Sequence, residues 1–351
     1  MGQNNIFKYY FATDYMLETV LYMYCLLFIN TFYLYKLDVS RNILLLNSQN
    51  NDTFISSELI DTQSAENCKG FSETVRQLPD NDYNFWNWFA GIIDGDGNFD
   101  IRTNPFSKKK VLKQIRIKLH NRDIRILTRI QDYLHIGKIR TEKNKPYSIY
   151  IVSTKETMTY ILNNINGLIR LKVPSFREAC YLCNIDYIEA NYNIGLNDPY
   201  FAGLVDTDGS IVFNYTGNRI ECNLEFKFNE YSSKLNFDNT ILNCKPTIIK
   251  RKKASVLKGS KDFSSIAFKF QNVSHMIFIY NYFMHNKLYC NMKFYRVTKI
   301  KSFLEIRKYK IFPKHSIEHK IYSNFVINWI KYDNPLWYKV PFVNKYLLYK
   351  D

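Results

Sequence analysis

The sequence lacks the cysteine pattern of a disulfide-stabilised or zinc-binding protein. Its seven cysteines are odd in number and scattered, and its C-x-x-C pair, Cys180 and Cys183, has no second pair. A disulfide framework shows an even set of cysteines, and a structural zinc site needs four ligands. The spacing of Cys180 and Cys183 suits one helix face, so we expect free thiols in a core.

A membrane-spanning run is also lacking. One nearly uncharged apolar stretch, residues 20–35, has sixteen residues, whereas a membrane helix needs about 20. It lacks a small-residue cleavage site of the secretory type. Residues 50–80 are then polar and rich in Ser, Thr, Asn, Asp and Glu, which is typical of a linker. The sequence leaves membrane association of residues 20–35 open and assigns no chemistry to residues 1–80.

Glycine and proline are few. The chain of 351 residues has 12 Gly and 9 Pro beside 28 Tyr and 26 Phe, with many Asn, Ile and Lys. AT-rich codons favour these abundant residue types. The composition indicates a gene in an organellar genome, and we expect a mitochondrial rather than a chloroplast origin.

Acidic side chains are outnumbered by basic ones. Lys and Arg together number 48 against 32 Asp and Glu, which gives a net charge of +16 and a pI near 9.3. Such an excess predicts a polyanionic partner such as nucleic acid. The alternatives are an anionic membrane surface, or solvated charge that serves no partner.

One ten-residue pattern, in contrast, is present twice. Residues 88–97 read WFAGIIDGDG and residues 200–209 read YFAGLVDTDG, an offset of 112 positions. Both copies hold an aromatic-apolar start, Ala-Gly, two apolar residues, an acid, a small residue, a second acid and a glycine, in that order. A match of this length indicates two duplicated half-domains.

Each copy has the pattern of the last turns of a helix. At about 100° per residue its two acids lie roughly 200° apart, so only one of them can face a partner helix. Small residues, among them Gly91 and Gly203, would let two such helices approach more closely than the usual ~8–10 Å between axes. Gly97 and Gly209 then predict a glycine stop at each helix C-terminus.

The second acid of each copy, Asp96 or Asp208, falls at the helix C-terminus. There the helix dipole disfavours a carboxylate by about 0.3–1 kcal/mol, so the duplicated choice suggests that a cation offsets the cost. Helices packed side by side would bring both acids together, a layout suited to divalent metals on oxygen ligands. The alternative is two core helices that end in ordinary Asp-Gly turns, which the duplication disfavours.

At these residues the chain resembles the LAGLIDADG homing endonucleases, in the two-motif, single-chain form often encoded in group I introns of organellar genomes. The resemblance covers roughly residues 82–310. Phe89 and Phe201 replace the leading Leu of the family motif. Thr207 replaces a small residue, and we expect its bulk to loosen the helix seam slightly.

The resemblance implies a role for each acid. Carried over by position, Asp96 and Asp208 are the catalytic, metal-binding carboxylates, and Mg²⁺ is the expected ion. Asp94 and Asp206 serve the helix framework instead. This division agrees with the opposite faces on which the two acids of one copy lie.

Further site residues follow from the resemblance alone. The family often has a catalytic lysine near the scissile phosphate, where it polarises water or stabilises charge. Lys172, in GLIRLKVPSF, matches that position, and Lys293, in LYCNMKFYRV, is its less close counterpart. A polar residue after the second strand of each half lies near the active centre. Asn121 and Asn229 are the candidates, and helix N-capping is the equally open alternative.

The function that the resemblance implies is site-specific cleavage of double-stranded DNA in support of intron mobility. Metal ions between the paired acids would activate water for attack on each strand. A monomer without a small-molecule substrate is expected. The alternative is an RNA maturase that binds its own group I intron as a splicing cofactor, with or without nuclease activity. Intact acids in both copies favour the nuclease, because an RNA-binding scaffold does not need paired metal ligands.

Residue periodicity after each repeat predicts an α+β fold. In the first half, helices are expected at 85–96, 124–134 and from 154, and strands at 98–103, 113–120, 137–141 and 147–152. In the second half, strands are expected at 211–215, 223–229, 247–252 and 265–271, and a helix at 274–284. The order αββαββα, which the resemblance also implies, predicts two pseudo-symmetric half-domains whose antiparallel sheets form a β-saddle.

These elements divide the chain into four expected parts. Residues 1–80 form a poorly defined N-terminal extension or linker, derived either from an upstream exon or from a leader. The first half-domain is 81–192, the second is 193–310, and 311–351 is a C-terminal tail.

The open face of the saddle is where DNA is expected to lie. Ile115, Ile117 and Leu119 alternate with polar residues, so this strand has one apolar and one basic face. Polar side chains on such a face can reach base edges in the major groove, while lysines contact phosphates. The candidate DNA-binding residues are Arg102, Gln114, Arg116, Lys118, Asn121, Lys138, Arg140, Lys227, Asn229, Lys250, Arg251 and Lys269.

Overall fold

A computed structural model describes residues 78–141, 143–253, 263–340 and 343–346, all within one unit, Ser72–Asp351. The apolar run at 20–35 and nearly all of the expected extension lie outside these residues. Within the described ranges, no helix combines the length and apolar character needed to cross a bilayer.

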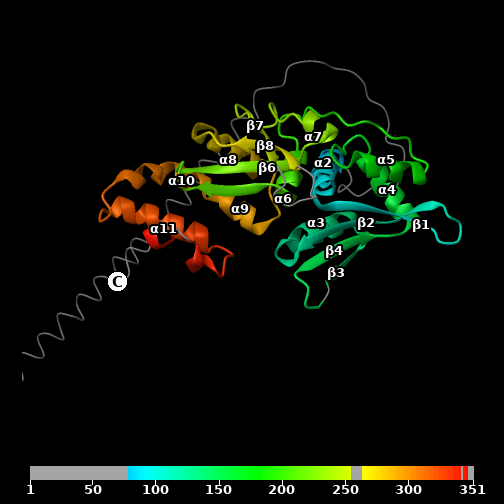
Figure 1. Cartoon of the computed structure of the whole chain (residues 1–351), viewed down its shortest axis with the longest axis horizontal. Helices are drawn as coiled ribbons and strands as arrows, with labels where there is room; N and C mark the ends of the chain where they lie inside the picture. Colours follow the sequence, from blue (N-terminus) through cyan, green and yellow to red (C-terminus); the bar gives the residue numbers. More distant parts are fainter. Residues whose placement is uncertain (1–77, 142, 254–262, 341–342, 347–351) are drawn as a thin grey trace, which may run out of the picture. The chain divides into compact units, whose positions relative to one another are not determined.

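The first half follows the expected order of elements (Figure 1). Its strands form one antiparallel sheet in the order β1-β2-β4-β3. The elements are α2 (Leu78–Asp96), β1 (Gly97–Thr103), β2 (Lys110–His120), η2 (Asn121–Asp123), α3 (Ile124–Leu134), β3 (Lys138–Thr141), β4 (Tyr147–Val152), α4 (Lys155–Ile165) and α5 (Val173–Leu182). Helix α2 begins within the stretch that was expected to be a linker.

The second half repeats this topology, with the sheet order β5-β6-β8-β7. The elements are α6 (Tyr200–Thr207), β5 (Ser210–Asn214), β6 (Arg219–Lys227), α7 (Glu230–Lys234), β7 (Thr247–Lys253), β8 (Phe263–Phe270), η3 (Val273–His275) and α8 (Met276–His285). The α+β class and the duplicated αββαββα order are therefore confirmed. The halves differ in the length of the middle helix, because α7 has 5 residues where α3 has 11.

The alternation within the second strand of each half is confirmed, with one exception. Ile115, Ile117 and Leu119 of β2 are buried, as are Leu224 and Phe226 of β6. Each sheet therefore buries one face in its core. The strand expected at 223–229 extended two residues further than the structure shows: β6 ends at Lys227, the chain turns into α7, and the Phe228 side chain is exposed.

The repeat helices α2 and α6 pack against each other through glycine. A Cβ placed on Gly91 would lie 2.3 Å from the carbonyl oxygen of Tyr200. A Cβ on Gly203 would lie 2.1 Å from the carbonyl oxygen of Trp88. Because both contacts are with backbone, which cannot rotate away, only glycine fits at either position. The predicted close helix approach is confirmed.

Thr207 lies in this seam. It faces Gly95 of α2, where an added Cβ would lie 2.0 Å from the Thr207 hydroxyl oxygen. That hydroxyl donates to the carbonyl of Gly203 at 3.1 Å, within its own helix. The absence of a side chain on Gly95 makes room for the threonine between the helices.

Gly97 and Gly209 follow the ends of the repeat helices, as expected, but without a left-handed backbone conformation. Neither has a positive φ. A Cβ on Gly97 would lie 2.6 Å from the Cα of Ile93, and one on Gly209 would lie 2.5 Å from the Cα of Val205. The chain folds back tightly onto the last helical turn, and glycine is needed for that close approach.

Several helices follow the second repeat of αββαββα and include most of the expected tail (Figure 1). They are α9 (Asn291–Thr298), α10 (Ile300–Ile306), η4 (Arg307–Ile311), α11 (Ile317–Lys331), η5 (Trp337–Lys339) and α12 (Val343–Tyr346). Trp329 of α11 packs 5.9 Å from the ring of Phe213, and Tyr322 donates to Asn218 at 2.7 Å. Helix α11 thus packs against the sheet side of the second half.

Replacing Gly203 by Ala should strongly destabilise the fold. The new Cβ would overlap the α2 backbone, and overpacking of this kind costs about 1–3 kcal/mol or more in the free energy of unfolding. Gly195 is the matched control, because an added Cβ there would have no atom within 4 Å and its φ is not positive. Urea unfolding should place Gly195→Ala within about 1 kcal/mol of the wild type. Equal losses in both variants would show that the seam is wider than described.

Candidate active site

The first acid of each repeat joins the two repeat helices. Tyr200 donates its hydroxyl to Asp94 at 2.7 Å, and Trp88 donates its indole N–H to Asp206 at 3.0 Å. Trp88 and Tyr200 hold the same position in their repeats, so the two bonds cross the seam reciprocally. All four side chains are buried. Asp94 and Asp206 are therefore framework residues, in agreement with the expectation.

The same two carboxylates also hold the segments that lead into later helices. Asp94 accepts the backbone N–H groups of Arg170 and Lys172, at 2.7 and 2.9 Å, just before α5. Asp206 accepts those of Tyr289 and Cys290 just before α9. A negative charge near a helix N-terminus is favourable.

Burial and hydrogen bonding act in opposite directions on these acids. Burial raises the pKa of Asp94 and raises that of Asp206 to about 6. The backbone and side-chain donors around each carboxylate lower the pKa again, because they stabilise the charged form.

The second acids, Asp96 and Asp208, have a different environment. Asp96 is half-buried and Asp208 exposed, at the C-terminal ends of α2 and α6. Within the described part of the chain, only burial and nearby charges act on their pKa values, with no hydrogen-bond donor. Partial burial raises the pKa of both, and the negative charge of Asp208 raises that of Asp96 further. The two carboxylates therefore lie close enough to repel each other.

A lysine ammonium group lies at the end of each repeat helix. Lys172 Nζ donates to the carbonyls of Gly95 and Gly97. Lys293 Nζ donates to three consecutive carbonyls, the last that of Thr207, each at 2.8 Å. Both positive charges lower the pKa of Asp96 and Asp208. The helix dipole disfavours a carboxylate at each of these helix ends, and the sequence suggested that a bound cation offsets this cost. The ammonium groups of Lys172 and Lys293 offset part of it.

The acids fit an open metal site better than a closed one. No cluster of three or more His, Cys, Asp or Glu side chains able to hold a metal occurs among the described residues. Asp96 and Asp208 present carboxylates without hydrogen-bond donors, whose mutual repulsion a cation would relieve. Hard divalent cations accept one or two protein carboxylates when phosphate and water supply the remaining oxygens.

Basic candidates gather on one face of the first sheet. The strand register aligns Arg116 and Lys118 of β2 with Lys138 and Arg140 of β3, across β4. Lys118, Lys138 and Arg140 are exposed. The Lys118 ammonium lies 3.6 Å from the centre of the Tyr147 ring. This face is basic, as the alternation predicts.

Other candidates are already engaged by acids. Arg102 pairs with Asp100 at 2.7 Å, and Gln114 donates to the same carboxylate at 3.0 Å. The bonds from Arg102 are the main reason that the pKa of Asp100 is held below its ordinary value. In the second sheet, Arg251 pairs with Glu225 at 3.2 Å. These side chains would have to exchange an acid for a phosphate or a base edge.

The remaining basic candidates lie on the second sheet. Lys227 is exposed at the end of β6, and Lys269 of β8 is half-buried. Lys250 of β7 lies 5.3 Å from the centre of the Phe228 ring.

The amide candidates Asn121 and Asn229 are used within the fold. Asn121 donates to the carbonyl of Lys145 at 2.9 Å and accepts the Ser148 hydroxyl at 2.8 Å. Asn229 accepts two backbone N–H groups at the start of α7 and forms a capping box with Ser232. N-capping, the alternative left open for both, is thus found at Asn229.

Three residues of the seam escaped the sequence argument: Trp88, Tyr200 and Arg170. Trp88 and Tyr200 are the first residues of the two repeats. Their residue types could have indicated the contact, because a buried Trp N–H or Tyr O–H usually donates to an acceptor. Arg170 is buried, donates to the carbonyl of Asn191 at 2.6 Å and lies 4.2 Å from the Tyr200 ring centre. No local pattern separates it from the other arginines.

Comparison with known proteins finds a family model that matches the first repeat. Residues 89–174 match the model described as LAGLIDADG endonuclease. The chain is 31% identical over 140 residues to the intron-encoded RNA maturase bI4 of Saccharomyces cerevisiae, covering 39% of this chain and 21% of that protein. It is 28% identical over 150 residues to the intron-encoded DNA endonuclease ai2b of Dictyostelium discoideum, covering 42% and 54%.

The matched lengths are partial. The chain spans about a fifth to a half of the length of these two relatives. A solved structure of the meganuclease I-SmaMI bound to uncleavable DNA is 14% identical, with a TM-score of 0.45, and the match covers 70% of this chain and 96% of that one.

Replacing Asp208 by Asn should stabilise the metal-free protein at neutral pH. A carboxyl whose pKa is raised on folding holds its proton more tightly in the native state. Its contribution to stability is therefore lost as pH rises from the unfolded value, about 4, through the raised native value. In EDTA, the Tm of Asp208→Asn should exceed that of the wild type at pH 7, and the difference should shrink toward pH 3.

Asp100→Asn is the control of opposite sign. Its pKa is lowered in the native state, so its ionised form contributes stability above the ordinary carboxyl pKa, and this is lost as pH falls through the lowered value. This variant should melt below the wild type at pH 7. A similar loss of Tm in both variants would contradict the repulsion between Asp96 and Asp208.

Proposed function

We propose that the chain is a LAGLIDADG endonuclease that acts as a monomer and cuts both strands of a specific double-stranded DNA target, since residues 89–174 match the model of that family. The observation that carries the proposal is the pair of carboxylates without hydrogen-bond donors, Asp96 and Asp208, at adjoining helix ends. One carboxylate per repeat matches one cut per DNA strand. Relatives named as intron-encoded proteins support a role in intron mobility and a mitochondrial gene.

Cleavage in this family depends on a metal ion, and we assign Mg²⁺. Asp96 and Asp208 would hold it, with phosphate and water oxygens as the remaining ligands. When bound, the ion lowers the pKa of a water molecule and offsets charge on the leaving oxygen. Asp94 and Asp206 keep the two helix ends at a fixed separation through their cross-seam bonds.

Lys172 and Lys293 give the site a positive charge beside each acid. An ammonium group near the scissile phosphate would stabilise the charge that develops during attack. Each lysine also satisfies carbonyls at the end of a repeat helix, so it serves the fold and the chemistry together.

The DNA would lie across the open faces of the two sheets. Lys118, Lys138 and Arg140 are exposed there and suit phosphate contact, which supplies salt-dependent affinity for any sequence. Arg102 and Gln114 would read base edges after exchanging their bonds to Asp100 for bonds to DNA. Differences between the halves favour an asymmetric target.

A second function, binding of group I intron RNA as a splicing cofactor, is favoured by one observation. The relative that is 31% identical to this chain is named an RNA maturase. A maturase would use the basic surface without the paired carboxylates. Splicing activity should therefore survive substitutions at Asp96 that abolish cleavage.

Asp96→Asn and Asp208→Asn should each abolish double-strand cleavage in Mg²⁺ while largely preserving DNA binding. Each removes a charge that holds the metal ion but little contact area. Cleavage of a plasmid that carries the joined flanking exons, measured beside a binding titration, tests this. Asp132→Asn, an exposed acid on α3, is the control and should cut normally. Cleavage of both strands at the wild-type rate by either active-site variant would refute the assignment.

Lys172→Met should slow the single-turnover cleavage rate with little change in DNA affinity. The ammonium group acts on charge that develops in the transition state, so its loss appears in the rate. Lys155→Met, an exposed lysine on α4, should alter neither quantity. A thermal melt checks that the capped helix end remains folded. An unchanged rate with weaker binding would reassign Lys172 as a phosphate contact.

A further inference from the structure

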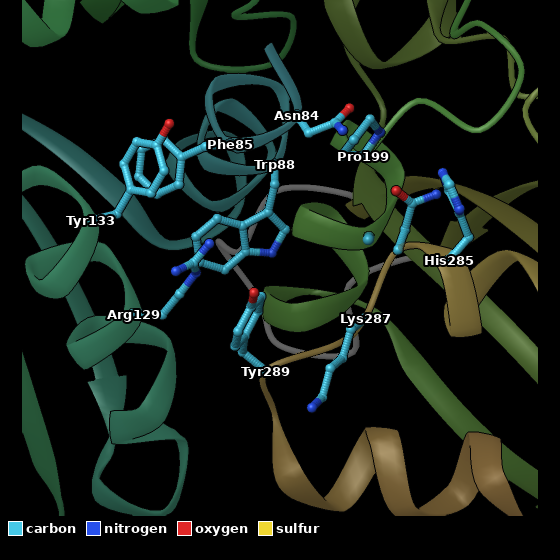
Figure 2. A pocket seen from close by; sticks show the side chains of 11 residues that line it. Asn84, Phe85, Trp88, Arg129, Tyr133, Pro199, His285, Lys287 and Tyr289 are labelled. Atoms are coloured by element: carbon cyan, nitrogen blue, oxygen red, sulfur yellow. The ribbon is translucent and has the colours of Figure 1, made fainter. Parts of the chain in front are cut away.

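A cavity of about 380 Å³ lies at the opposite ends of the repeat helices from the paired acids. Its walls come from the second and third turns of α2, from the start of α6, from α3, and from the end of α8 and the segment after it (Figure 2). It therefore opens between the two halves but is separate from the candidate active site. Its volume falls in the range of small-molecule sites.

One wall of the cavity is aromatic and fixed. The rings of Trp88 and Tyr289 lie 5.0 Å apart, and those of Phe85 and Tyr133 stack at 3.7 Å. The Trp88 indole is held by its bond to Asp206, so the ring cannot turn away. Such ordered rings offer a stacking surface to a planar ligand.

The cavity is also cationic, and the acid beside it, Asp82, accepts the hydroxyl of Tyr133. The Arg129 guanidinium lies 5.4 Å from the Tyr133 ring centre and 5.6 Å from that of Tyr289, and its Nε is buried without a hydrogen bond. Exposed His285 and Lys287 line the same cavity. No Asp or Glu is among its lining residues. A buried donor without an acceptor is costly, and an anionic ligand would satisfy it.

We propose that this cavity binds one nucleotide, with the base against the Trp88 and Tyr289 rings and the phosphate at Arg129 and Lys287. The base and the phosphate of a nucleotide match, respectively, the aromatic wall and the positive charge of the cavity. The aromatic wall suits the planar base, and the cations suit the phosphate. The nucleotide is either free in solution or an unpaired residue of an RNA strand.

The experiment titrates the full-length protein with AMP, adenosine, inorganic phosphate and a single-stranded RNA hexamer. AMP should bind at least about tenfold more tightly than adenosine or phosphate. Arg129→Gln and Lys287→Gln should each weaken AMP binding about tenfold, because each removes a charged hydrogen-bond donor. Arg125→Gln is the control: it lies one turn earlier on α3, is exposed and bonds Asn291 instead.

The hexamer distinguishes the two sources of the nucleotide. Displacement of AMP by a more tightly bound hexamer supports the RNA strand, whereas binding of AMP alone supports a free nucleotide. The proposal fails if neither binds, if phosphate binds as tightly as AMP, or if both variants bind normally. Lys287 is exposed, so its variant tests the site even if Arg129→Gln does not fold. DNA cleavage does not enter the readout, so this outcome is independent of the proposed endonuclease activity.

Discussion

The close contact between α2 and α6 is the constraint on which the rest of the molecule depends. Gly91 and Gly203 let each helix backbone touch the other, and no side chain could replace either hydrogen atom. The reciprocal bonds Tyr200 to Asp94 and Trp88 to Asp206 then fix the register of this contact. Because both sheets follow directly from these helices, the seam positions both half-domains and both candidate catalytic acids.

Two carboxylates separated by one residue receive opposite tasks from their surroundings. Asp94 is buried and accepts hydrogen bonds from three donors, so its carboxylate is fully engaged within the fold. Asp96 lies at the helix end with lysines and a second acid nearby, and no described donor uses its oxygens. The physical reason is the helical rotation of roughly 200° between them, which turns one inward and leaves the other at the surface.

The duplication is exact in order of elements but not in detail. Helix α7 is less than half the length of α3, and α9 to α12 extend the second half beyond the shared pattern. Lys172 precedes α5, whereas Lys293 lies inside the first turn of α9. Each ammonium nevertheless ends at the carbonyls of its repeat helix. The two helix ends thus receive equivalent hydrogen bonds from lysines at unequal positions.

The sequence alone determined the duplication, the αββαββα order and the buried faces of β2 and β6, because these depend on local periodicity and on a long repeated motif. Helical spacing also indicated that only one acid of each pair could face the partner helix. Only the tertiary structure decided which partners the acids meet: Trp88 lies 118 positions from Asp206, and no local pattern reports such a contact. The same holds for Lys172 and Lys293 at the helix ends, for the amides of Asn121 and Asn229 and for the packing of α11. Most of these contacts join groups from distant parts of the chain, which only folding brings together. The cap at Asn229 is local, but the sequence pattern did not specify the geometry of that turn.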